Sequence, residues 1–169
     1  MNAFKFMRPG RVAPFTGVRW PEPGEWIEGD APVALCRSGV HAIQPEALPV
    51  WIAEELWRVE LEDAETVAPG IVAASRGRLV ERIEAWNDDS AREFAGACAA
   101  HVGGVSGRAA EYAADARASA EEARADFTTT TVAYMARHAA EAAEPGGFAR
   151  ERAWQADWLA QRLGLTAEI

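Results

Sequence analysis

The sequence contains only two cysteines, Cys36 and Cys98, among its 169 residues. Two thiols cannot build the disulfide framework of a small secreted domain, and a chain of this length can bury a sufficient core without one. The sequence also lacks an apolar run of about 18 residues, the length of a membrane span, and its first residues have no signal-peptide core. We therefore expect a cytoplasmic protein that does not interact with membranes.

Positive charge is scarce as well. The chain has 17 lysines and arginines against 26 aspartates and glutamates, so it is acidic, with a formal net charge of -9. Such a surface repels the phosphate backbone of nucleic acids, which predicts that the protein does not bind them. Residues 1–24 are locally basic, because they carry four basic side chains and a single acid.

Proline and tryptophan become rare after residue 87. Eight of the nine prolines and five of the seven tryptophans precede this point, whereas alanine dominates the remainder. This contrast predicts an α+β fold, in which a small, mostly antiparallel sheet in residues 1–87 packs with an alanine-rich helical part in residues 88–169. The sequence shows no internal repeat and no long linker, so we expect residues 1–169 to form a single domain.

The local patterns predict individual elements of this fold. Alternation and turn residues predict strands at 3–7, 26–28, 32–36, 40–43, 56–61 and 70–74, with a short helix that begins at Pro45. Residues 79–86 fit either a strand or a helix, and a hairpin turn at 76–78 favours the strand. Capping and glycine signals predict helices at 90–102, 106–126, 131–143 and 148–163, with the threonines at 128–131 interrupting the helical pattern.

The segment 36–62 is compact and is the first place to look for a site. It contains a glycine turn, a histidine in an apolar strand, a proline-opened helix and a half-buried strand, without spare length. We expect a small-molecule ligand in a cleft between sheet and helices, lined by Trp20, Trp26, His41 and Trp51. His41 is the candidate for a catalytic role, because folding alone explains it least well.

Thiolate and imidazole ligands suggest a metal site as an alternative, formed by Cys36, His41, Cys98 and His101. Their spacing matches no established zinc motif, so we predict neither a metal nor a cofactor. Cys36 could instead act as a nucleophile with His41 or His101 as its base. A further alternative is acid–base chemistry by a group of carboxylates at Glu54, Glu55, Glu60 and Glu62.

Residues 36–42, with the sequence Cys-Arg-Ser-Gly-Val-His-Ala, resemble a motif of uncharacterised phage and actinobacterial proteins, Cys-x-x-Gly-x-His before a short helix. This resemblance covers about the first 85 residues and implies no site residues. Residues 39–61 are also similar to a central segment of the ADP-ribosyltransferase fold, which implies NAD binding. The histidine or arginine that grips nicotinamide in the first strand of that fold is absent from residues 3–7.

The sequence thus leaves three functions open. The first is binding of a small molecule, or enzymatic action on it, in the cleft. The second is a protein-interaction or oligomerisation module, because a narrow alanine stripe on helix 106–126 could pack against a second copy in a homodimer. The third is a degenerate protein of the ADP-ribosyltransferase type.

Overall fold

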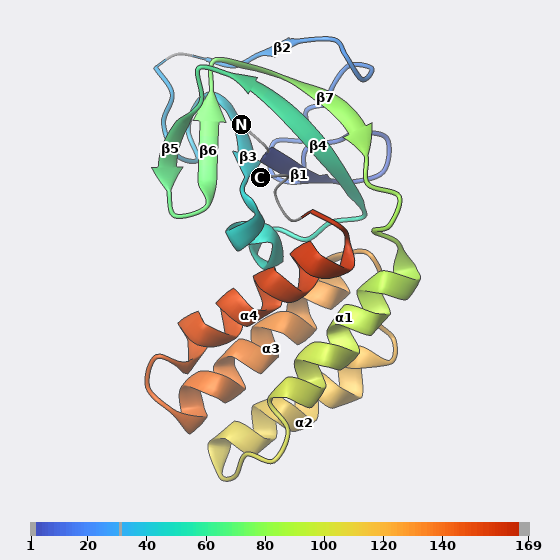
Figure 1. Ribbon diagram of the computed structural model, residues 1–169, viewed down its shortest axis with the longest axis vertical. Coiled ribbons are helices and arrows are strands. Elements are labelled where there is room, and N and C mark those ends of the chain that lie inside the picture. The colour runs from blue at the N-terminus through green and yellow to red at the C-terminus, as the bar shows by residue number, and fades with distance from the viewer. Residues whose placement is uncertain (1–2, 31, 166–169) are drawn as a thin grey trace.

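The computed structural model describes residues 3–30 and 32–165 and has the predicted α+β architecture, with the sheet above the helices (Figure 1). The strands are β1 (Ala3–Met7), β2 (Ile27–Glu28), β3 (Val40–Ile43), β4 (Glu55–Glu62), β5 (Glu65–Ala68), β6 (Ile71–Ala74) and β7 (Arg76–Arg82). The helices are the 3-10 helix η1 (Pro45–Val50) and α1 (Asp88–His101), α2 (Arg108–Ala120), α3 (Phe127–Ala143) and α4 (Gly147–Arg162).

The seven strands form one antiparallel sheet in the order β2-β7-β4-β1-β3-β6-β5. β6 and β7 lie on opposite sides of this order, yet Ser75 alone separates them along the chain. One bent segment therefore supplies a strand to each side of β1. This connection requires the sheet to curl strongly, so that it has a concave inner face and a convex outer face. Figure 1 shows this curl, with β7 and β4 crossing above β1 and β3.

The central strand β1 shows how the curled sheet divides the apolar residues. Phe4 and Phe6 lie on the outer face, in a core that includes η1 and helices α1 to α4. Ala3 and Met7 lie on the inner face, in a second core formed by the sheet and the loop that follows β1. Side chains alternate between the two faces of a strand, so Lys5 is directed to the inner face together with Ala3 and Met7.

Gly77 in β7 lies where strands from both sides of the sheet come close together. A Cβ atom at this position would lie 2.7 Å from a methyl carbon of Leu61 and 2.9 Å from one of Val40. Val40 is in β3 and Leu61 is in β4, so strands from both sides of the sheet converge on this residue. Any larger side chain would push the converging strands apart.

Several strand predictions are confirmed, and others are wrong. The strands predicted at 3–7, 40–43, 56–61 and 70–74 are β1, β3, β4 and β6, and residues 79–82 of the ambiguous segment belong to β7. Residues 76–78 are in β7 rather than in a hairpin turn, because β6 and β7 pair with different partners. The predicted strand at 32–36 is a turn, in which Cys36 has a left-handed backbone (φ 57°).

Two predictions about the helix starts are also corrected. The capping box of α1 consists of Asn87 and Ser90, since Asn87 Oδ1 accepts the amides of Asp89 and Ser90 at 3.0 and 3.1 Å. The helix thus starts earlier than the sequence pattern indicated. The threonines at 128–131 lie inside α3, because Asp126 caps this helix ahead of them.

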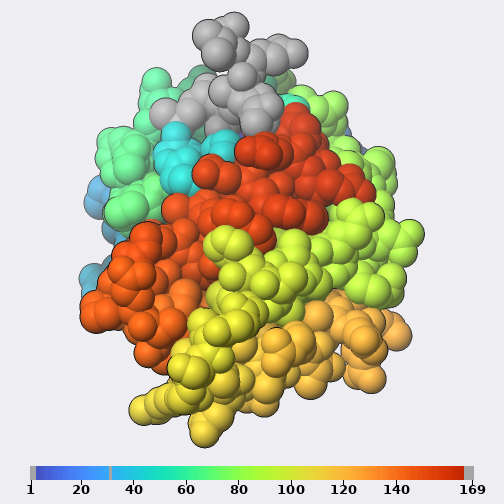
Figure 2. Space-filling view, turned by 60° about the horizontal axis from the view of Figure 1, so that its bottom comes forward, coloured from blue at the N-terminus to red at the C-terminus, as the bar shows by residue number. Residues whose placement is uncertain are grey.

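The four α-helices pack as a bundle, and α4 and α1 lie side by side on the face shown in Figure 2. Alanines supply the contacts between helices, and the stripe of α2 is buried inside the chain at Ala109, Ala113, Ala116 and Ala120. The outer-face core contains residues from both the sheet and the bundle. No helix among the described residues is long and apolar enough to cross a membrane.

Candidate functional site

A cavity of about 550 Å³ lies in the sheet half. Its walls are residues 4–6 of β1, residues 39–43 in and before β3, the loop residues 13–16, 18 and 20, residues 27–30 and 36–38, and Trp51. Helices α1 to α4 contribute no side chain to it. The cavity lies where β1 and β3 separate, because Phe4 and Ile43 are the one residue pair that joins these strands.

Three of the four residues expected at the site line this cavity. Trp20 is buried in its wall, and Trp51 contributes another part of the wall with Phe15 at 5.7 Å between ring centroids. Trp26 does not line this cavity. Its ring lies instead beneath the guanidinium groups of Arg76 and Arg78, at 4.3 and 4.8 Å.

His41 lines the cavity, but backbone groups hold both of its ring nitrogens. The backbone N–H of Cys36 donates to Nε2 at 3.3 Å, and Nδ1 lies 3.2 Å from the carbonyl oxygen of Gly39. An N–H can donate only to an unprotonated nitrogen, so these contacts favour the neutral tautomer with its proton on Nδ1. The ring therefore holds the turn before β3 in place, which accounts for the histidine that the sequence left unexplained.

Lys5 is the ionisable group in the cavity that the sequence reading missed. It is the single lysine of the chain, half-buried on the inner face of β1. Its ammonium donates to the carbonyl of His41 at 2.7 Å and lies 5.3 Å from the centre of the Trp20 ring. Burial without a carboxylate partner among the described residues lowers the pKa of Lys5 to about 8.

One signal in the sequence could have identified Lys5. Residues 3–7 are apolar at every position except this one, and both faces of such a strand are expected to be buried. A lysine in that setting must be directed into the core or into a cavity.

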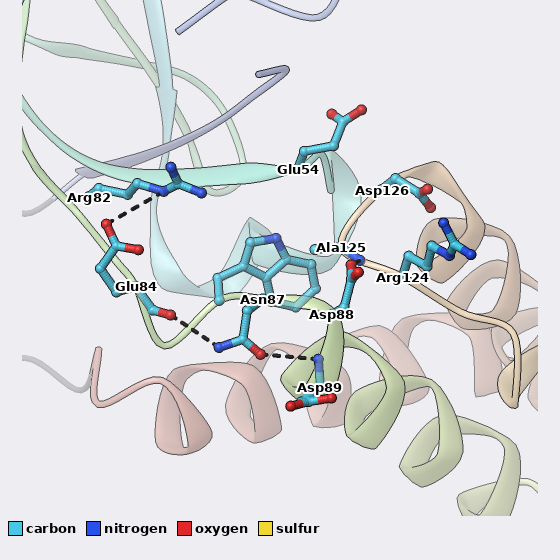
Figure 3. Close-up of a pocket in the computed structure, with 10 residues that line it drawn as sticks. Glu54, Arg82, Glu84, Asn87, Asp88, Asp89, Arg124, Ala125 and Asp126 are labelled. Atoms are coloured by element: carbon cyan, nitrogen blue, oxygen red, sulfur yellow. Dashed lines mark hydrogen bonds and ion pairs between the residues drawn. The ribbon is translucent and has the colours of Figure 1, made fainter. Parts of the chain in front are cut away.

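A second hollow, of about 480 Å³, does lie between the sheet and the helices (Figure 3). Its walls are charged: five carboxylates surround two arginines, Arg82 and Arg124. Asn87 caps α1 here, and Asp88 accepts the amide of Ala125 at 2.9 Å, so local backbone groups engage these side chains. The second hollow thus lies where the cleft was predicted, between the sheet and the helices. Three of the residues predicted to line that cleft, Trp20, His41 and Trp51, line the first cavity instead.

The four metal-site candidates are not brought together. Cys36 and His41 are neighbours in the sheet half, whereas Cys98 and His101 lie on α1. No group of three or more candidate ligands was found among the residues described. His101 Nδ1 instead lies 2.6 Å from the buried carboxylate of Glu151.

The cysteines are poorly placed for nucleophilic catalysis. Cys98 is fully buried, and its burial, together with the nearby charge of Glu151, raises the pKa of its thiol well above the ordinary value. Cys36 is exposed, but it is the backbone N–H of Cys36 that contacts His41. The structure therefore provides no thiol–imidazole hydrogen bond between this pair.

The carboxylates of β4 form hydrogen bonds and ion pairs with other residues of the protein. Glu55 is buried and accepts hydrogen bonds from the indole of Trp57 and the amides of Gly10 and Arg11, at 3.0, 3.0 and 3.3 Å. Burial alone would raise the pKa of Glu55, but these donors and Arg82 outweigh that effect and lower it. Glu60 and Glu62 pair with arginines of β7, and Glu54 lines the second hollow.

Comparisons with known proteins do not add a relative: no family model, no curated protein and no solved structure matches this chain.

Proposed function

We propose that this protein binds a small molecule, with a largely apolar body and one polar reactive group, in the cavity between β1, β3 and the loop of residues 13–20. The observation that carries the proposal is the pairing of a roomy cavity with a single amine. A volume of about 550 Å³ lies in the range of small-molecule sites, which typically combine apolar walls with a few polar groups.

The walls support a planar or aromatic ligand. Trp51 and the exposed Phe15 offer ring surfaces to the cavity, and Trp20 is buried in its wall. Lys5 provides a hydrogen-bond donor on the inner face of β1, where an occupant with an acceptor oxygen would meet it. These features favour binding over a purely structural role for the cavity.

Saturation-transfer NMR with a set of aromatic fragments, including 2-naphthylmethanol, tests this function. Trp51→Leu removes one wall, and we expect it to weaken fragment binding about tenfold, the equivalent of one lost aromatic contact. Trp154→Leu is the matched control, because Trp154 is also half-buried but stacks on His101, 3.8 Å away, outside the cavity. If no fragment responds to Trp51→Leu, the proposal fails.

The alanine stripe of α2 supports the interaction module less well than the sequence suggested. Its four alanines contact α1 and α3 of the same chain, so this surface is already covered. The cavity therefore remains the better basis for a function.

A further inference from the structure

We infer that Lys5 is a nucleophile that forms a reversible imine with an aromatic aldehyde bound in the cavity; this inference rests on the proposed function. It assigns a chemical class to the ligand and a covalent role to a side chain that otherwise resembles a buried structural lysine.

The position of Lys5 carries the first step of the argument. Its neighbours on the inner face of β1 are Ala3 and Met7, and the Trp20 ring covers it from the loop. Among the described residues, its ammonium has one polar contact, the carbonyl of His41, and no carboxylate to hold the positive charge. Desolvation therefore increases the share of the neutral amine relative to an ordinary lysine, and the neutral amine is the form that attacks carbonyl groups.

The other ionisable groups of the wall do not compensate this charge. Glu28 lies 3.5 Å from the guanidinium of Arg76 in an ion pair between β2 and β7, and the imidazole of His41 is bound to backbone groups. Asp30, Cys36 and Arg37 line the mouth of the cavity and are exposed. These groups are thus exposed or have other partners, whereas the amine lies beside the Trp20 ring.

The reaction balances without a redox partner. The nitrogen lone pair of Lys5 attacks the carbonyl carbon, a C–N bond forms, and the carbonyl electron pair moves to oxygen. Transfer of a proton from nitrogen to oxygen gives a carbinolamine. Addition of a proton to the hydroxyl lets it leave as water, and the nitrogen lone pair forms the C=N bond of a protonated imine. Water reverses each step, so the complex is a reversible covalent one.

The size of the cavity selects the probe. An engineered cavity of about 150 Å³ holds benzene, so a space of about 550 Å³ accommodates a bicyclic aldehyde. We choose 2-naphthaldehyde with sodium cyanoborohydride, which converts the imine into a stable secondary amine. The alcohol 2-naphthylmethanol has a similar shape but cannot form an imine, so it reports binding alone.

The experiment measures the rate of adduct formation at Lys5 by peptide mass spectrometry after cleavage at arginine. The α-amino group of the same chain provides the reference rate of a second amine. We expect Lys5 to react at least about tenfold faster than the α-amino group, because binding concentrates the aldehyde beside it. The preference should disappear in denaturant, and 2-naphthylmethanol should slow the reaction at Lys5 alone.

Lys5→Arg is the matched variant, because arginine can still donate to the His41 carbonyl but cannot form this imine. It should fold, as judged by circular dichroism, and give no adduct at position 5. If 2-naphthylmethanol binds but Lys5 reacts no faster than the α-amino group, the imine is excluded and the binding function stands. If Lys5 reacts without competition by the alcohol, the ligand class is wrong; if neither compound binds, the inference and the function it rests on both fail.

Discussion

The sheet half and the helical half bury polar groups in different ways. In the helical bundle, Glu151 binds both His101 and Gln155, at 2.6 and 3.1 Å, and Arg137 donates to the carbonyls of Ala133 and Pro49. In the sheet, the ammonium of Lys5 has one backbone carbonyl and a cavity beside it. Polar groups in the bundle thus connect helices, whereas the amine in the sheet retains room for a ligand.

The residues that fill the two cores differ as well. Alanine dominates the helix contacts and allows close packing, whereas the inner-face core of the sheet also contains tryptophan, methionine, leucine and valine. Large rings do not fill a curled sheet evenly, and the cavity lies where β1 and β3 part. We therefore expect a ligand site in the sheet half. The close packing of the bundle is expected to contribute mainly to stability.

The largest loss of stability is expected from a substitution where the sheet half and the helical half join. Trp86 is fully buried after β7, donates to the carbonyl of Ala53 at 2.9 Å and contacts the edge of Phe6. Trp86→Ala should lower the free energy of unfolding by about 4 kcal/mol through the cavity it leaves. Urea unfolding followed by circular dichroism and by fluorescence should show one shared transition. Two separate transitions would mean that the halves are independent.

Lys5 should give the sheet half a distinctive pH dependence. The folded state releases the proton near pH 8 and the unfolded chain near the ordinary pKa of 10.5, so stability rises between these values. The rise should be about 3 kcal/mol relative to Lys5→Met, which lacks the titrating group. Denaturation of both proteins over this pH range measures the difference, in which other groups cancel. Parallel curves would show that Lys5 keeps an ordinary pKa.

Ala116→Leu tests whether the stripe of α2 belongs to the bundle. Ala116 is fully buried against neighbouring helices, so a larger side chain should cost about 2 kcal/mol of stability through overpacking. Ala114→Leu is the control on the exposed face of the same helix and should change little. If the stripe instead joins two copies, sedimentation will show a dimer that Ala116→Leu dissociates.

Glu55 should have the smallest of these effects, because the substitution keeps its shape. Glu55→Gln replaces an acceptor of three hydrogen bonds by an amide and should cost about 1.5 kcal/mol at neutral pH. Its folded pKa is lowered, so this difference should shrink as pH falls below about 4.3, the usual pKa of a glutamate. Glu60→Gln, at an exposed ion pair with Arg78, serves as the control. Equal losses for both variants would contradict a special role for Glu55.

Local patterns predicted the elements whose structure depends on neighbours in sequence. The alternation around Trp57 and Val59 predicted β4, and capping and glycine signals predicted the helices. The turn at Cys36 was missed, because nothing in its sequence signals a left-handed backbone at a cysteine. The hairpin at 76–78 was wrong because the partners of β7 are decided by the curl of the whole sheet.

The candidate site shows the same limit. Trp20, His41 and Trp51 were predicted and meet at the cavity, although they come from a loop, a strand and the end of η1. Trp26 was misplaced because arginines from β7 cover it, and that contact is distant in sequence. The environment of Lys5 depends on the loop that carries Trp20, so composition alone could not reveal it.

Because the chain has a single lysine, a lysine-specific protease can cut β1 at one peptide bond only. A lysine-specific endoprotease has one cleavage site in this chain, after Lys5, in the middle of a strand that pairs with both β3 and β4. Cleavage there requires β1 to leave the sheet, so the rate of the single cut reports how often the central strand opens.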